Sequence, residues 1–362
     1  MKKPYFAYVG SRTTRARNAR GEGLTVWHID PGQTEWSAIQ TVGDLINPSF
    51  LALDHQHRHL YVVHGDLSEI SAFRIDALNG RLEFINRQST QGKNPVHLSI
   101  DPSGHFIVLA NHLTSSLATL PILPDGRLGA LTSLHYLDGH LGPHRVEQTC
   151  AKPHQVEFDK TGKFIAVPDK GLDKTFVFRL LVNGKIEQVS EMAGREGCGP
   201  RHITFHPCNH FAWIVNELDS TVTSCRFEAG HGVLTPFQIL SSLPDTYTGN
   251  SRAAEIVVSH DGRFVYVSNR GCDCIAAYAI EPETGCLKPL GWTDSQGQTP
   301  RFITFAPNGG ALFVANEDSD TIINFSHDAK SGQILDAGIA ARTGSPTCIV
   351  FVADRSKAGA TT

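Results

Sequence analysis

The sequence lacks a strong excess of either charge, and it lacks any long apolar run. Its formal net charge is −4 over 362 residues, which gives little electrostatic attraction for nucleic acid or anionic membranes. No apolar run approaches the roughly 20 residues of a membrane-spanning helix. The basic Met1–Pro4 is similar to the start of a signal peptide, but the following stretch, Tyr5–Ser11, is too short and ends in polar sequence. We therefore expect a cytoplasmic protein that binds neither nucleic acid nor membrane.

Motifs for metals, nucleotides and nucleophilic catalysis are missing as well. There is no CxxC pair, and no HExxH, GxSxG, Walker or GxGxxG motif in a suitable context. The 8 cysteines are irregularly spaced. Cys272 and Cys274 are too close for a comfortable disulfide with each other, so we expect reduced thiols. His55, His57 and His59 alternate but straddle a predicted turn, which favours a surface turn over a metal site. We expect no metal and no cofactor.

What the sequence has instead is a repeat. Gly199–Pro207 followed by Phe211–Glu217 is typical of a strand, a tight turn and a second strand, which antiparallel pairing would bring side by side. Similar units recur with a period of about 47 residues, and their inner strands start near positions 48, 95, 153, 200, 253, 300 and 346. A period of about 40–50 residues with four short strands per unit is typical of a β-propeller.

Seven units predict an all-β, seven-bladed β-propeller, formed as a single domain by residues 1–362. The last unit ends before its outer strands, whereas Tyr5–Val9 at the other end has the pattern of a second strand without a first. We expect Tyr5–Val9 to pair with Cys348–Val352. That pairing would close the ring and remove the edges that an open sheet exposes.

Two columns of residues should meet on one rim of this ring. In a propeller blade the first strand lines the central channel, so its start lies beside the end of the second strand. The residue after the repeat proline, or its equivalent, is in chain order Ser49, Val96, His154, Arg201, Ala254, Arg301 and Thr347. The second strands end in His64–Gly65, Asn111–His112, Asp169–Lys170, Asn216–Glu217, Asn269–Arg270 and Asn316–Glu317. We expect the recurring Asn or Asp to cap a turn, whereas the residue after it varies in charge.

Consecutive blades would therefore bring His154, Arg201, Glu217 and Arg270 to one rim. Arginine clamps carboxylates in a planar, bidentate manner, and His and Glu transfer protons. The set suits an anionic substrate whose oxygen gains charge in the transition state. The alternative is a charge network that merely holds the blades in register. Further round the rim we expect four substrate-binding side chains, His112, Lys170, Arg301 and Glu317.

Three loops are expected to cover the same rim. Two repeat steps run long, and their extra residues lie in Tyr136–Lys152 and Leu243–Arg252. Long loops on a rigid scaffold often carry binding residues, so we assign His144 and Gln148 to substrate binding. The third loop, Ser11–Gly23, is either solvated or an electropositive lid that attracts anions, and the first of its arginines joins the substrate-binding set. These arginines are Arg12, Arg15, Arg17 and Arg20.

Four motifs resemble the seven-bladed β-propeller lactonase family, which includes bacterial 6-phosphogluconolactonases and fungal 3-carboxy-cis,cis-muconate lactonizing enzymes. They are Pro153–His154, Gly199–His202, Asn216–Glu217 and Ser268–Gly271. The resemblance covers nearly the whole chain and implies lactone chemistry without a metal. It also implies catalytic roles for His154, Arg201, Glu217 and Arg270.

The preferred function is hydrolysis of a sugar-acid lactone, of the aldono-, aldaro- or phosphogluconolactone type, by metal-independent acid/base catalysis. Arg201 and Arg270 would hold the anionic group and the developing oxyanion. Glu217 or His154 would activate water, and the other would protonate the leaving alkoxide. Two alternatives stay open: a muconate-type cycloisomerase that closes a dicarboxylate to a lactone, and a non-catalytic binding platform. The sequence indicates neither the particular lactone nor an oligomeric state.

Overall fold

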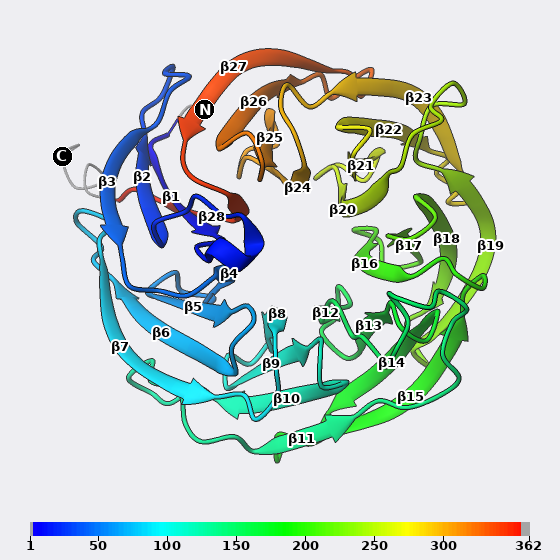
Figure 1. Ribbon diagram of the computed structural model, residues 1–362, viewed down its shortest axis with the longest axis horizontal. Helices are drawn as coiled ribbons and strands as arrows, with labels where there is room; N and C mark the ends of the chain where they lie inside the picture. Colours follow the sequence, from blue (N-terminus) through cyan, green and yellow to red (C-terminus); the bar gives the residue numbers. More distant parts are fainter. Residues whose placement is uncertain (1–2, 356–362) are drawn as a thin grey trace.

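The repeat units fold into seven four-stranded antiparallel sheets, arranged as blades around a common centre (Figure 1). The computed structural model describes residues 3–355. The innermost strands are β4 (Pro48–Leu53), β8 (Pro95–Ile100), β12 (Glu157–Phe158), β16 (Pro200–Phe205), β20 (Arg252–Val258), β24 (Pro300–Phe305) and β28 (Pro346–Ala353). The second strands are β1 (Tyr5–Ser11), β5 (His59–His64), β9 (Phe106–Asn111), β13 (Ile165–Asp169), β17 (Phe211–Asn216), β21 (Phe264–Arg270) and β25 (Ala311–Asn316).

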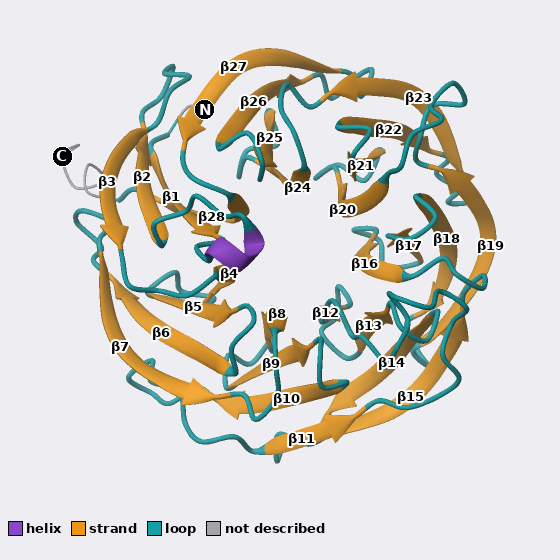
Figure 2. Cartoon of the chain, viewed as in Figure 1, coloured by secondary structure: helices purple, strands orange, loops and turns teal. Residues whose placement is uncertain are grey.

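The outer half of each blade holds two further strands. The third strands are β2 (Leu24–Ile29), β6 (Glu69–Ile75), β10 (Ser116–Pro121), β14 (Lys174–Leu180), β18 (Thr221–Glu228), β22 (Cys274–Ile280) and β26 (Thr321–His327). The fourth strands are β3 (Ser37–Val42), β7 (Leu82–Ser89), β11 (Ser133–Tyr136), β15 (Ile186–Ala193), β19 (Val233–Ser241), β23 (Leu287–Asp294) and β27 (Ile334–Arg342). Among residues 3–355 the one helical element is a short 3-10 turn, η1 (Arg15–Arg17), close to the centre of the ring (Figure 2).

The ring closes as the sequence predicts. β1 pairs antiparallel with β28, with Phe6 opposite Val352 and Val9 opposite Ile349. β28, β1, β2 and β3 then form one complete blade from both ends of the chain. The prediction of an all-β, seven-bladed propeller closed by the N-terminal strand is confirmed. No helix within the described residues is long and apolar enough to cross a membrane.

A repeated contact joins neighbouring blades. The aromatic side chains of Tyr8, Tyr61 and Tyr266 are fully buried on second strands. Their hydroxyls donate to glycine carbonyls in the next blade, at 2.8 Å to Gly80, 3.1 Å to Gly126 and 2.7 Å to Gly332. Trp213 repeats the contact through its indole Nε1, 3.2 Å from the carbonyl of Gly285. These glycines lie at positive φ in the turns before the fourth strands, so the turn signals of the repeat also position the partners that fix one blade against the next.

Two local expectations differ from the structure. Cys272 and Cys274 form a disulfide, so the expectation that they would not pair is wrong. Their Cα atoms are 5.4 Å apart, within the range that a disulfide spans, because Asp273 between them has a positive φ of 52° and turns the chain. The inner strand expected near Pro153 begins only at Glu157. Pro153 itself makes an isolated bridge to Asp169.

The Asn or Asp that recurs at the end of most second strands holds the turns of the rim, as predicted. The side-chain amide of Asn316 donates to the Ser295 carbonyl at 2.9 Å, and that of Asn269 to the Ser242 carbonyl at 2.9 Å. Asp169 accepts three backbone N–H groups on one oxygen. Because these groups fix the strand ends, the residue after each one is placed reproducibly around the rim.

Candidate active site

One cavity at the rim gathers most of the predicted site residues. It has a volume of about 300 Å³ and is strongly polar. Its lining includes His154, Glu217, Arg270, His112, Lys170, Arg301 and Arg12. Arg201 lies beside it in a narrower recess that also exposes atoms of His154 and Arg301. Glu317 contacts two of the lining arginines.

The long loop 137–156 is placed less simply than predicted. His144 lines a neighbouring cavity together with Arg252 and Arg270. Gln148 is buried away from both cavities, where its amide donates to the Lys170 carbonyl at 2.9 Å and its oxygen accepts the backbone N–H of His144 at 2.9 Å. Gln148 therefore holds the loop against the rim.

Glu217 is the centre of the charge network. Lys170 Nζ and an Arg270 guanidinium nitrogen each lie 3.4 Å from its Oε1, and Arg252 approaches the same oxygen at 3.5 Å. Arg201 Nε lies 3.4 Å from Oε2. Burial alone would raise the pKa of Glu217, but Arg270, Lys170 and Arg201 together lower that pKa well below its ordinary value. Glu217 is thus a permanent carboxylate that fixes cations at the edge of the cavity.

Two members of this network were not assigned from the sequence. Glu147, on the long loop, contacts Lys170 at 3.1 Å and Arg252 at 2.7 Å. Burial would raise the pKa of Glu147, but the hydrogen bond from Arg252 and the charge of Lys170 lower it to about 2. Arg252 stands just before the repeat position at 253, where this blade has alanine in place of proline. The missing proline was the available signal that this blade start departs from the repeat.

A chain of hydrogen bonds extends inward from His154. His154 Nδ1 lies 3.1 Å from His202 Nε2, and His202 Nδ1 lies 2.7 Å from Glu255 Oε1. When Glu255 is ionised it accepts the His202 Nδ1–H, so His202 Nε2 accepts the Nδ1–H of His154. His154 then presents an unprotonated Nε2, for which we find no hydrogen-bond partner within residues 3–355. His202 follows Arg201 in the sequence motif, and Glu255 lies on β20; neither was predicted to take part.

Burial sets the protonation of this chain. It lowers the pKa of His154 and of His202 well below the ordinary value, and the positive charge of Arg201 adds to the effect. His112, whose ring centroid lies 5.1 Å from that of His154, has its pKa lowered to about 3 by burial and by Lys170. Burial raises the pKa of Glu255 to about 7, although Arg201 opposes the shift. The imidazoles are therefore neutral at pH 7.

The chain is thus a closed seven-bladed propeller with a charged cavity at one mouth of its central channel. The model of the family described as "Lactonase, 7-bladed beta-propeller" matches residues 6–351. The chain belongs to this family, and the resemblance drawn from its motifs is confirmed.

Relatives match over nearly their full length. A 6-phosphogluconolactonase from Bacillus subtilis is 29% identical over 352 residues, which cover 96% of this chain and 98% of the relative. A 6-phosphogluconolactonase from Formosa agariphila is 30% identical, with 90% and 94% covered. Among solved structures, the periplasmic gluconolactonase PpgL of Pseudomonas aeruginosa has a TM-score of 0.87 at 28% identity, covering 97% of this chain and 99% of that one. Because that protein is described as periplasmic, the cytoplasmic location of this chain stays a prediction.

Proposed function

We propose that the chain hydrolyses a sugar-acid lactone of the 6-phosphogluconolactone type. One observation carries the proposal: a neutral imidazole, His154, shares a cavity with a carboxylate that holds four cations, Glu217. The cavity has a base for water and fixed positive charge for the oxygens of a lactone. Relatives named 6-phosphogluconolactonase that match nearly end to end support the same function.

His154 is the proposed general base. Its Nε2 accepts a proton from water as the water oxygen adds to the lactone carbonyl carbon. When the tetrahedral intermediate collapses, the ring carbon–oxygen bond breaks and the imidazolium returns the proton to the leaving alkoxide, which gives the hydroxy acid. One imidazole thus performs both transfers, with a contribution of about 10²–10⁴-fold to the rate. Glu217 is less available as a base, because four cations already surround its two carboxylate oxygens.

The cations stabilise charge on the substrate. Arg201 and Arg270 are the proposed partners of the developing oxyanion, since both are fixed by Glu217 and by backbone carbonyls. Arg201 donates to the Ala254 carbonyl, and Arg270 donates to the Ala253 carbonyl at 3.1 Å. Groups that are held before the reaction starts need no reorganisation in the transition state. Because these fixed arginines already provide the positive charge that a metal would otherwise supply, we propose that the reaction is metal-independent.

His202 and Glu255 are proposed positioning residues. His202 contacts His154 and Glu255 contacts His202, and together they set which nitrogen of His154 carries its proton. A ring-closing reaction on a muconate-like dicarboxylate, and a purely binding role, are not favoured by any specific contact in the site.

The test is a screen of aldono-, aldaro- and phospho-lactones, following proton release, with the wild type, His154→Gln and a chelator-treated sample. We expect hydrolysis of at least one lactone, loss of two or more orders of magnitude in His154→Gln, and full activity after chelation. Full activity of His154→Gln would overturn the assignment of the base. Loss of activity on chelation would overturn metal independence. A wild type that hydrolyses none of these lactones would end the proposal itself.

A further inference from the structure

The motif that provides Arg201 and Glu217 occurs a second time. Pro300–Arg301 and Asn316–Glu317 repeat Pro200–Arg201 and Asn216–Glu217 with the same spacing. Arg301 lies 3.3 Å from Glu317 Oε2, and Arg301 lines the same cavity as His154. This second pair lies on a different sector of the ring, at β24 and β25 rather than β16 and β17 (Figure 1).

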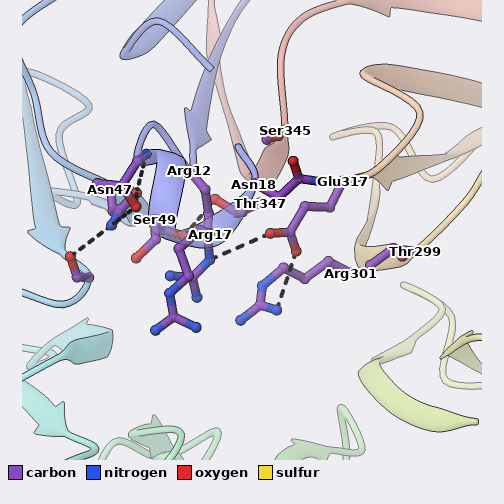
Figure 3. A network of polar contacts seen from close by, with 12 residues as sticks. Arg12, Arg17, Asn18, Asn47, Ser49, Thr299, Arg301, Glu317, Ser345 and Thr347 are labelled. Atoms are coloured by element: carbon purple, nitrogen blue, oxygen red, sulfur yellow. Dashed lines mark hydrogen bonds and ion pairs between the residues drawn. The ribbon is translucent and has the colours of Figure 1, made fainter. Parts of the chain in front are cut away.

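The N-terminal loop adds a third member to the second pair. Arg12 follows β1, and its Nε lies 3.5 Å from Glu317 Oε1 (Figure 3). The residue is only 4% exposed, yet its guanidinium NH1 has no hydrogen-bond partner within residues 3–355. Oδ2 of Asp66 is 4.0 Å from this nitrogen, too far for a hydrogen bond. A buried guanidinium donor without an acceptor is costly.

Ser49 provides a second unused donor at the same place. Ser49 is 7% exposed and its Oγ also lacks a hydrogen-bond partner within the described residues. Both groups converge on Gly65: a Cβ added there would lie 3.0 Å from Ser49 Oγ and 3.3 Å from Arg12 NH1. The equivalent position in other blades carries a large polar side chain, such as Lys170 or Glu217. A side chain at position 65 would press against both donors, so the glycine leaves them uncovered on that side. Arg12, Ser49 and Arg301 together line the narrow recess beside the main cavity.

We propose that Arg12, Ser49 and Arg301 form a second oxyanion subsite, which binds a phosphate or carboxylate carried by the substrate away from its lactone ring. This inference rests on the proposed function. The anion would accept hydrogen bonds from Arg12 NH1 and Ser49 Oγ, while Arg301 supplies charge from the cavity side. Burial, aided by the neighbouring Arg301, lowers the pKa of Arg12 to about 9, so a bound anion would also relieve the desolvation of this cation.

Substrate discrimination tests the subsite. The assay compares kcat/KM for 6-phosphogluconolactone, a glucarolactone and the uncharged gluconolactone in three variants, Arg12→Gln, Ser49→Ala and Gly65→Ala. Ser49→Ala removes one donor. Gly65→Ala places a methyl group against both donors without changing the charge, and the φ of Gly65 lies outside the left-handed region. Arg15→Gln is the matched control, because Arg15 is exposed on the same loop and has no side-chain hydrogen bond or ion pair within residues 3–355.

We expect the ratio of kcat/KM for the anionic over the uncharged lactone to fall on the order of 10-fold or more in Arg12→Gln, to fall less in the other two variants, and to stay unchanged in Arg15→Gln. A larger fall for the phospho-lactone assigns a phosphate, and a larger fall for the glucarolactone assigns a carboxylate. Equal losses on charged and uncharged lactones would overturn the subsite while leaving the lactonase proposal intact. If Arg12→Gln does not fold, the other two variants decide.

A second measurement does not depend on catalysis. Inorganic phosphate should raise the Tm of the wild type, and Ser49→Ala and Gly65→Ala should reduce that increase relative to Arg15→Gln. An increase that is the same in all variants would overturn the subsite. If no lactone is hydrolysed but the increase still depends on Ser49 and Gly65, the anion subsite stands and the proposed reaction fails.

Discussion

The two copies of the Pro-Arg and Asn-Glu motif have the same spacing and similar Arg–Glu contact distances but different surroundings. The Arg–Glu contact is 3.4 Å for Arg201 and Glu217 and 3.3 Å for Arg301 and Glu317. Four cations surround Glu217, whereas Glu317 has Arg12 and Arg301. The Glu317 side chain is also more exposed, at 13% against 6%. A repeat unit therefore fixes the pair, and the adjacent blades decide what the pair does.

The largest expected difference between the copies is in catalysis. Arg201→Ala should lower kcat/KM by about 10²–10³-fold, the loss seen when one oxyanion donor is removed, because Arg201 is fixed against the proposed reaction centre. On the uncharged lactone, the fold-loss in kcat/KM of Arg301→Ala should be at least ten times smaller than that of Arg201→Ala. Steady-state kinetics on both variants, with circular dichroism as the check on folding, measure the difference. Equal losses would mean that the two copies act alike, contrary to their different surroundings.

Stability should separate the two glutamates next. Glu217→Gln removes the carboxylate shared by the buried Lys170 and Arg201 and by the more exposed Arg252 and Arg270. Glu147 still pairs with Lys170 and Arg252, but the other two lose this partner, and we expect a loss of about 3–5 kcal/mol in the free energy of unfolding. Glu317→Gln, with two cations and more solvent, should lose about 1.5–3 kcal/mol. Urea denaturation measures both values.

The pH dependence of the Glu217 effect has a definite sign. The folded pKa of Glu217 is lowered, so its contribution is fully present above the ordinary value of 4.5 and disappears only as pH falls through the lowered folded value. The difference in the free energy of unfolding between wild type and Glu217→Gln should therefore persist at pH 5 and shrink in stronger acid. A gap that already closes at neutral pH would contradict this.

The repeat explains why the fold and part of the site could be predicted from the sequence. Turn glycines and prolines recur at similar positions in each repeat unit. His154, Arg201, Glu217 and Arg270 follow fixed positions within those units. The contacts of Glu147 and Arg252 could not be predicted in the same way, because they come from loops that differ between blades. The Cys272–Cys274 pairing depended on a positive φ at Asp273 that spacing alone does not indicate.

A smaller effect should sharpen the role of the inner chain of hydrogen bonds, which only the first copy has. Burial raises the pKa of Glu255 to about 7, and only the ionised carboxylate orients His202 so that His154 keeps an unprotonated Nε2. In the wild type, kcat/KM should therefore fall as pH decreases through about 7. Glu255→Gln should remove this decline and lower the plateau by about 10-fold, within the range of general-base effects. A purely structural role for Glu255 would lower the rate without changing the shape of the profile.

The smallest expected effect lies at the outer edge of the second copy. Arg17 pairs with Asp66 there, and their side chains are 39% and 31% exposed. Solvent screens such a pair, so Arg17→Gln should cost only about 0.2–1 kcal/mol at low salt, and this cost should vanish near 1 M salt, where the screening length is about 3 Å. Arg15→Gln, which removes the same charge from the same turn without an ion pair, should cost nothing at either salt concentration. Arg17→Gln could instead destabilise the protein as much as Glu317→Gln. The charge network of the second copy would then extend to the loop surface as one cooperative unit. The two copies would differ in how many residues their networks include, and not in how deeply those residues are buried.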